Sequence, residues 1–139
     1  MLTRVLFALV LIGLSVSAAP AEEAKVLAAG VTDHEITVAE LEKGVALPVP
    51  RFNTAAIAYV WAANLKKGDI VEIALLNGDK SLLHNTETLA EDRASYLLQA
   101  GKRGVPAGGW PEGDYHAELK ITRDDKLLIE QSTTPVVFE

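Results

Sequence analysis

The chain has 139 residues, with 13 Lys and Arg against 19 Asp and Glu, no cysteine, and a formal net charge of −6. This length is typical of one domain. The absence of cysteine excludes a disulfide framework, thiolate catalysis and thiolate-bound zinc. An acidic chain without a basic run also argues against nucleic acids and anionic membranes as partners.

Residues 1–21 have the pattern of an export signal. Arg4 supplies the positive charge, residues 5–16 form the apolar core, and Ala21 ends a small-residue cleavage site, with Ala18 as the alternative. The apolar core is shorter than the roughly 20 residues that a bilayer span needs, and no other apolar run approaches that length. We therefore expect removal of residues 1–21, a single domain over residues 22–139, and a periplasmic or secreted location.

The first half of the predicted domain contains one clear strand. Residues 35–38 alternate briefly, and residues 45–50 contain two prolines, which restrict them to a sheet edge or an irregular connection. Residues 55–65 alternate between two apolar faces, one with Ile57, Tyr59, Trp61, Ala63 and Leu65 and the other with Ala58, Val60 and Ala62. Two apolar faces predict a central strand that is covered on both sides, with Trp61 in the core.

The second half reads as short strands separated by turns. Residues 70–76 alternate and run into Asn77-Gly78, a strong hairpin signal, before a return over residues 81–84. Further strands are predicted over residues 115–122, 127–130 and 136–138, with a turn at residues 123–126. About seven short antiparallel strands are typical of an all-β sandwich or barrel.

Residues 88–100 carry two conflicting patterns. Thr88 and Glu91 match a helix capping box, and Gly101 suits the end of a helix. The same segment also alternates like a strand, with Ala94 and Tyr96 on one face. We favour one helical turn near residues 88–92 followed by a strand, and a longer helix is the alternative.

Residues 108–119 carry a resemblance to a known family of domains, and their sequence is Gly-Gly-Trp-Pro-Glu-Gly-Asp-Tyr-His-Ala-Glu-Leu. This stretch resembles the approach to the penultimate strand of exported immunoglobulin-like and fibronectin-III-like domains, with Gly113 and Tyr115 in the tyrosine-corner positions and Ala117 where an immunoglobulin domain has its second cysteine. The resemblance implies an immunoglobulin-like sandwich in which the Tyr115 hydroxyl bonds backbone a few residues upstream. It identifies a fold more than a function.

The same C-terminal stretch has a weaker resemblance to periplasmic copper-resistance sandwich proteins. Their copper site uses one histidine at the mature N-terminus and another in a late hairpin. The mature chain here would begin near residues 19–22, and its late turn reads Asp124-Asp125-Lys126, so both ligand positions lack histidine. We therefore predict neither a copper site of this kind nor a cofactor.

The chain has three histidines, His34, His84 and His116. No two lie within ten residues of each other, and no metal-binding motif includes them. We expect three surface histidines, with His116 pointing to solvent, although Asp33 and Glu35 beside His34 offer an incidental divalent site. A periplasmic metal-binding or metal-delivery protein that uses these histidines is the alternative function.

The predicted domain contains no sequence motif typical of nucleophilic catalysis. None of Ser81, Ser95 and Ser132 lies in a G-x-S-x-G or S-x-x-K context. Adjacent acidic residues occur in turns or would point to opposite faces of a strand. The sequence therefore favours a protein that is not an enzyme.

The loop over residues 101–111 is rich in glycine but lacks the order of a phosphate-binding loop. It joins the basic pair Lys102-Arg103 to Trp110, and exposed Arg and Trp are frequent interface anchors. These three residues form the candidate partner-binding loop, with the alternative that Trp110 folds back and plugs one end of the sandwich. We expect a non-catalytic domain, monomeric or weakly dimeric, that binds a protein or envelope component through end loops or an edge strand.

Overall fold

The computed structural model describes residues 23–139 except Arg103, and describes only the backbone of Lys102. The predicted export signal lies outside the described residues. The elements are β1 (Lys25–Thr32), α1 (Val38–Glu42), β2 (Ala56–Leu65), β3 (Ile70–Asn77), β4 (Lys80–Thr88), β5 (Arg93–Lys102), β6 (Asp114–Arg123), β7 (Lys126–Ser132) and β8 (Val136–Val137). Within the described part, no helix has the length and apolar character needed to cross a membrane.

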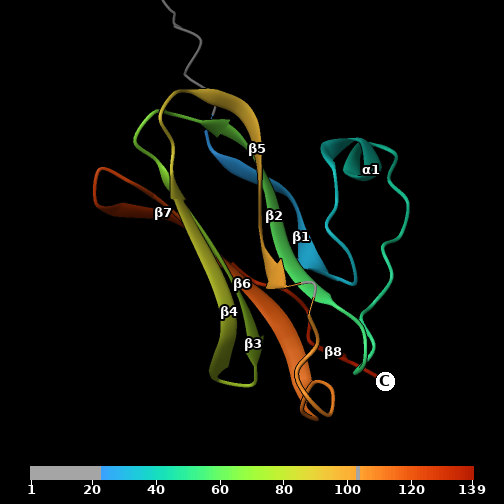
Figure 1. Cartoon of the computed structure of the whole chain (residues 1–139). Helices are drawn as coiled ribbons and strands as arrows, with labels where there is room; N and C mark the ends of the chain where they lie inside the picture. The colour runs from blue at the N-terminus through green and yellow to red at the C-terminus, as the bar shows by residue number, and fades with distance from the viewer. Residues whose placement is uncertain (1–22, 103) are drawn as a thin grey trace, which may run out of the picture.

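The strands form two antiparallel sheets that pack face to face (Figure 1). One sheet has the order β1-β2-β5, and the other has the order β4-β3-β6-β7, with the short β8 paired to β6. The prediction of an all-β sandwich is confirmed. The described part has eight strands. One of them, β1, was not predicted from the sequence, and residues 93–102 form one continuous strand.

Strand β2 is central and covered on both faces, as predicted. Its inner face consists mainly of small residues, Ala56, Ala58, Val60, Ala62 and Leu65. These residues meet larger side chains from the facing sheet, Val71, Ile73 and Leu75 of β3 and Ala117, Leu119 and Ile121 of β6. Its outer face carries Ile57 and Tyr59, which are nevertheless buried.

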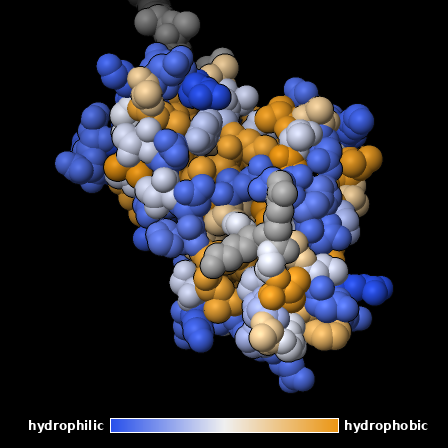
Figure 2. Space-filling model, viewed as in Figure 1, coloured by the Kyte–Doolittle hydropathy of each residue, from blue (hydrophilic) through white to orange (hydrophobic). Residues whose placement is uncertain are grey.

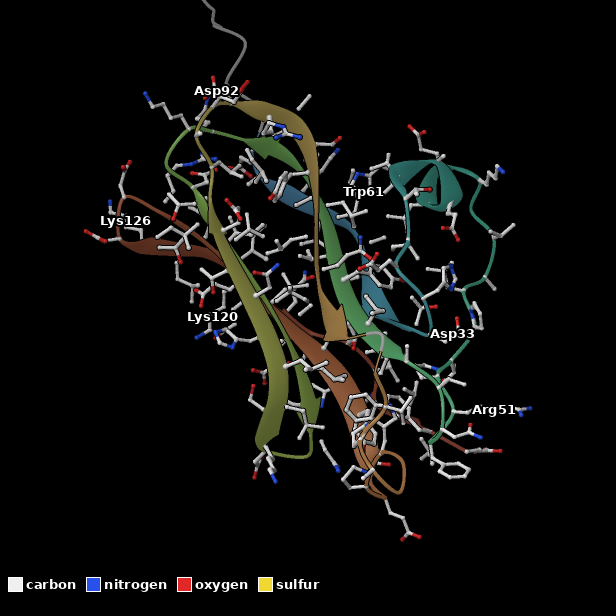
Figure 3. All side chains as sticks on the ribbon, viewed as in Figure 1. Asp33, Arg51, Trp61, Asp92, Lys120 and Lys126 are labelled. Atoms are coloured by element: carbon white, nitrogen blue, oxygen red, sulfur yellow. The ribbon has the colours of Figure 1, made fainter. Side chains whose placement is uncertain are left out.

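The predicted position of Trp61 in the core is wrong. Trp61 lies on the outer face of β2, on the side that faces α1 (Figure 3), and is only partly buried. Leu65, predicted on the same face as Trp61, belongs to the core instead. The reason is Asn64, whose φ of +64° places it in the left-handed region and breaks the two-residue alternation.

The connection from β1 to β2 contains the short helix α1, and the brief alternation of residues 35–38 does not form a strand. Thr37 caps the helix: its hydroxyl accepts from the Glu40 amide (3.2 Å), and the Glu40 carboxylate accepts from the Thr37 amide (3.3 Å). This reciprocal pair is a capping box. Residues 45–50 are irregular, in agreement with their two prolines.

The helical turn predicted near residues 88–92 is absent. The backbone of Leu89 instead bonds the β2–β3 turn in both directions, donating to the Asp69 carbonyl and accepting from the Gly68 amide, each at 2.9 Å. The Asp92 carboxylate accepts from the Lys67 amide (2.8 Å). These contacts with another turn outweigh the local helix signal, and β5 follows as a strand.

An ion pair stabilises the end of the sandwich that contains the β2–β3 turn. Asp69 is fully buried at the start of β3 and accepts two hydrogen bonds of 2.8 Å from the Arg123 guanidinium, at the end of β6. The Lys66 amide donates a third bond of 2.8 Å. Burial opposes ionisation of Asp69, but the bonds from Arg123 and Lys66 outweigh it, so the pKa of Asp69 is lowered.

Candidate partner-binding site

The loop before β6 turns sharply at two glycines. Gly108 and Gly109 have φ values of +80° and +89°, and the Gly109 amide donates to the Pro106 carbonyl (2.8 Å). A Cβ at Gly109 would lie 2.6 Å from Cδ2 of Phe52, so this position needs glycine for space as well as for conformation. The turn aims the next residue, Trp110, inward, and its amide donates to the Phe52 carbonyl (2.7 Å).

Trp110 occupies the core at this end of the sandwich and is only 7% exposed. Its indole N–H donates to the Thr54 carbonyl (2.7 Å). Its ring stands edge-on to Tyr115 and Phe138, at centroid distances of 6.4 and 6.3 Å, while those two rings stack 3.9 Å apart. The idea of Trp110 as an exposed anchor is therefore wrong, and the alternative in which it plugs one end is confirmed.

The tyrosine corner predicted from the family resemblance is present. The buried Tyr115 hydroxyl donates to the Pro111 carbonyl, four residues upstream. Burial raises the pKa of Tyr115, so the phenol stays protonated and able to donate. Gly113 has a φ of +139°, and a side chain there would collide with Asn77. The corner thereby fixes the path of the loop that carries Trp110.

An apolar pocket of about 460 Å³ opens between this loop and β4. It is lined by Leu82, Leu83, Gly104, Val105, Pro106 and Trp110. Leu82, Leu83 and Val105 are half-buried, while Trp110 is anchored in the core. Because an apolar surface exposed to water carries a free-energy cost, a preformed pocket of this kind suits an apolar side chain from another molecule.

The pocket adjoins an edge strand. In the described part, β4 pairs only with β3, and most of its nine residues are exposed. The Asn85 side chain links it to β5 by donating to the Gln99 carbonyl (2.9 Å). Figure 2 shows hydrophobic side chains between β4 and β5, framed by hydrophilic ones. An unpaired strand edge and an apolar pocket therefore meet on one side of the molecule.

The basic pair of the candidate loop, Lys102 and Arg103, is described only in part. The Lys102 backbone ends β5 opposite Ala56. Its side chain and the whole of Arg103 lie outside the described residues. Of the three predicted residues, Lys102, Arg103 and Trp110, only Trp110 is described as a lining residue of the pocket. The sequence reading missed Leu82 and Leu83, whose position beside the loop depends on the packing of the two sheets.

His34 is placed between two carboxylates. Its Nδ1 lies 2.8 Å from Oδ1 of Asp33, and its Nε2 lies 2.8 Å from Oε2 of Glu40. The hydrogen bonds to Asp33 and then Glu40 raise the pKa of His34. Because the carboxylates contact opposite ring nitrogens, they cannot join the same nitrogen around one metal ion. The geometry fits a protonated imidazole, which donates from both nitrogens.

The other two histidines lie on the outer face of the second sheet. His84 is exposed, and His116 is mostly covered, with its side chain 16% exposed and Nε2 3.6 Å from Glu118. His84 lines a second, shallow pocket of about 220 Å³ together with Ser81 and Glu118. Among the described residues, no hydrogen bond joins Ser81 to His84, and no three His, Asp or Glu side chains are arranged to hold a metal ion.

The chain was compared with protein-family models, with curated proteins and with solved structures, and none of the three comparisons finds a match. The structure itself defines the class of protein as an all-β sandwich of two antiparallel sheets. An apolar pocket lies on its surface beside the edge strand β4.

Proposed function

We propose that this protein is an exported, non-catalytic binding module that holds an extended segment of a partner protein against β4. The observation that carries the proposal is the apolar pocket of about 460 Å³ directly beside an unpaired strand edge. Addition of a strand to a sheet edge is a recurring mode of peptide recognition. In this mode the backbone bonds supply affinity, and pockets for side chains supply specificity.

The geometry gives each part of the site a role. The free edge of β4 offers backbone donors and acceptors to an added strand. One bulky apolar side chain of that strand would enter the pocket between Leu82 and Val105 and contact the ring of Trp110. Since Trp110 is fixed by Thr54, Tyr115 and Phe138, this wall of the pocket is in place before binding, which lowers the entropic cost of association.

The architecture supports an immunoglobulin-like assignment for this module. In the strand lettering of such domains, β1-β2-β5 takes the places A-B-E and β4-β3-β6-β7 takes C′-C-F-G, with the tyrosine corner at the start of β6. The pattern of residues 1–21 supports export to the periplasm or the medium. Both features suit a stable domain that presents a binding edge outside the cytoplasm.

A pull-down from an envelope extract tests this function, with the chain as bait. Val105→Asp puts a charge into the pocket, and we expect it to lose a partner that the wild type retains. The matched control is Leu127→Asp, on a side chain 55% exposed in β7 at the opposite end of the sandwich, which should retain it. Unchanged melting midpoints would show that both variants fold. Equal retention by both variants, or no partner with the wild type, would contradict the proposal.

A further inference from the structure

Residues 33–50, here called the strap, cross the outer face of the β1-β2-β5 sheet. Figure 1 shows α1 standing on the side of this sheet that faces away from the other sheet. The strap is fixed to the sheet near both of its ends. The Gln99 side chain bonds both backbone groups of Ile36, at 2.8 and 3.0 Å, and the Thr32 hydroxyl donates to the Pro48 carbonyl (2.9 Å).

The middle of the strap is held far less firmly. No residue of α1 is buried, and the helix is only five residues long. Short helices depend on tertiary contacts because nucleation is unfavourable. The side-chain contact that ties α1 back to the start of the strap is the bridge from Glu40 through His34 to Asp33, with 2.8 Å on each side of the ring.

That bridge requires a doubly protonated imidazole. A neutral ring has one nitrogen without a proton, and here that nitrogen would face a carboxylate oxygen at 2.8 Å. The His34 side chain is 41% exposed, so the ring is free to turn into water when it loses a proton. Deprotonation of His34 therefore breaks the two-sided bridge, because the neutral ring can donate to only one of the two carboxylates.

The sheet face on the side of α1 holds a buried polar atom whose hydrogen bonding is incomplete while the strap is closed. The indole nitrogen of Trp61 is buried, and it has no hydrogen-bond partner among the described residues. Trp61 faces α1 from the sheet (Figure 3). A buried donor without an acceptor destabilises the closed arrangement, and water would satisfy it in an open one.

We propose that the strap is a pH-sensitive cover, which stays closed while His34 is protonated and loosens around α1, uncovering Trp61, when His34 loses its proton. The charged groups at this contact are Asp33 and Glu40, with Lys43 at the end of α1 and Glu35 next to His34 in the chain. Tyr59, on the covered face, is neutral near pH 7, and burial raises its pKa further above the ordinary value of 10.0.

The direction of the pH dependence follows from the two partners. Hydrogen bonds to Asp33 and Glu40 raise the pKa of His34, so the bridge is complete below the ordinary value of 6.5 and is lost as pH rises through the raised value. The bond to His34 lowers the pKa of Glu40, so that side of the bridge is complete above 4.5 and is lost as pH falls through the lowered value. The cover is closed between these limits.

Nuclear magnetic resonance of the ¹⁵N-labelled chain from acid to alkaline pH tests the cover. The measurements are the His34 titration and the exchange with water of the α1 amides and of the two indole N–H groups. Trp110 is the internal control, since its N–H is bonded to Thr54. We expect exchange at Trp61 and α1 to accelerate severalfold more than exchange at Trp110 as His34 deprotonates.

Two variants link this exchange to His34. Glu40→Gln removes one carboxylate and should move the His34 midpoint and the Trp61 transition together to lower pH. Glu42→Gln makes the same change in the same helix, at a side chain that forms no hydrogen bond or ion pair with His34 in the described part, and should move neither. The inference is overturned if Trp61 and α1 exchange do not respond while His34 titrates, or if the two midpoints separate in Glu40→Gln.

Discussion

The hydroxyl of Tyr115 donates a buried hydrogen bond to the Pro111 carbonyl, at the turn that leads into β6. Tyr115→Phe keeps the ring stacked on Phe138 but leaves that carbonyl without its donor. We expect a loss of about 1 to 2 kcal/mol in the free energy of unfolding, measured by urea titration.

Tyr96→Phe is the control for this substitution. Tyr96 is half-buried in β5 with Arg93 over its ring, and its hydroxyl takes part in no hydrogen bond within the described residues. It should change stability by a few tenths of a kcal/mol at most. Equal effects of the two substitutions would contradict the structural role of the corner.

The two tryptophans differ in what their removal exposes. Trp110→Ala deletes a core ring that contacts Tyr115 and Phe138, and we expect a cost of about 3 to 5 kcal/mol. Trp61→Ala removes a partly buried ring under the strap and also an unsatisfied N–H, so its cost should be clearly smaller. Unfolding curves of both variants decide the order, and a larger cost at Trp61 would contradict the assignment of the core.

This order is the reverse of what the sequence suggested, and the reason is physical. Alternation shows that β2 has two apolar faces, but it does not show which face meets the other sheet. The inner face is the one with the small residues Ala56, Ala58 and Ala62, because the facing strands supply the bulk. The sequence left the position of Trp110 open between an exposed anchor and a buried plug, because its burial depends on the contact between Gly109 and Phe52, 57 residues earlier in the chain.

At the scale of elements, the pair Asp69–Arg123 joins the start of β3 to the end of β6. Asp69→Asn leaves Arg123 without its counter-charge, and we expect a cost of about 2 to 3 kcal/mol at pH 7. This is less than the usual cost of breaking a fully buried pair because the Arg123 side chain is 24% exposed. Thermal unfolding at several pH values is the measurement.

The pH dependence of this variant has a definite sign. The pKa of folded Asp69 is lowered below its ordinary value of 3.8, so its stabilisation is present above that value and is lost as pH falls through the folded pKa. The difference between wild type and Asp69→Asn should therefore shrink in acid. Asp79→Asn, in the exposed β3–β4 turn, is the control and should show no such trend.

Two elements show where local signals prevail and where they do not. Thr37 and Glu40 form a capping box and start a helix, whereas Thr88 and Glu91 have the same spacing and do not. At the second place, Leu89 is 5% exposed and its backbone bonds the β2–β3 turn, so tertiary contacts replace the helix. Sequence alone could not choose between them, because the deciding partners lie about 20 residues away.

At the scale of the molecule, the class of fold was predictable and the site was only partly so. The turns at Gly78 and at residues 123–126 and the Tyr115 corner have local signatures, and the structure confirms each of them. The pocket has none, because it forms where β4 meets a loop about 20 residues further along the chain. The sequence offered that loop as a candidate site, but it gave no sign of the strand β4 that lines the other side of the pocket.

Hydrogen exchange of the complex captured from envelope extract is the most direct test of strand addition. The free chain and the bound chain would be compared by mass spectrometry, segment by segment. We predict that the partner slows amide exchange in Lys80–Thr88, which forms the edge strand β4, and leaves Lys126–Ser132, the edge strand β7, unchanged. Slowing at β7 without any at β4 would contradict the account, because the partner would then occupy the opposite edge of that sheet.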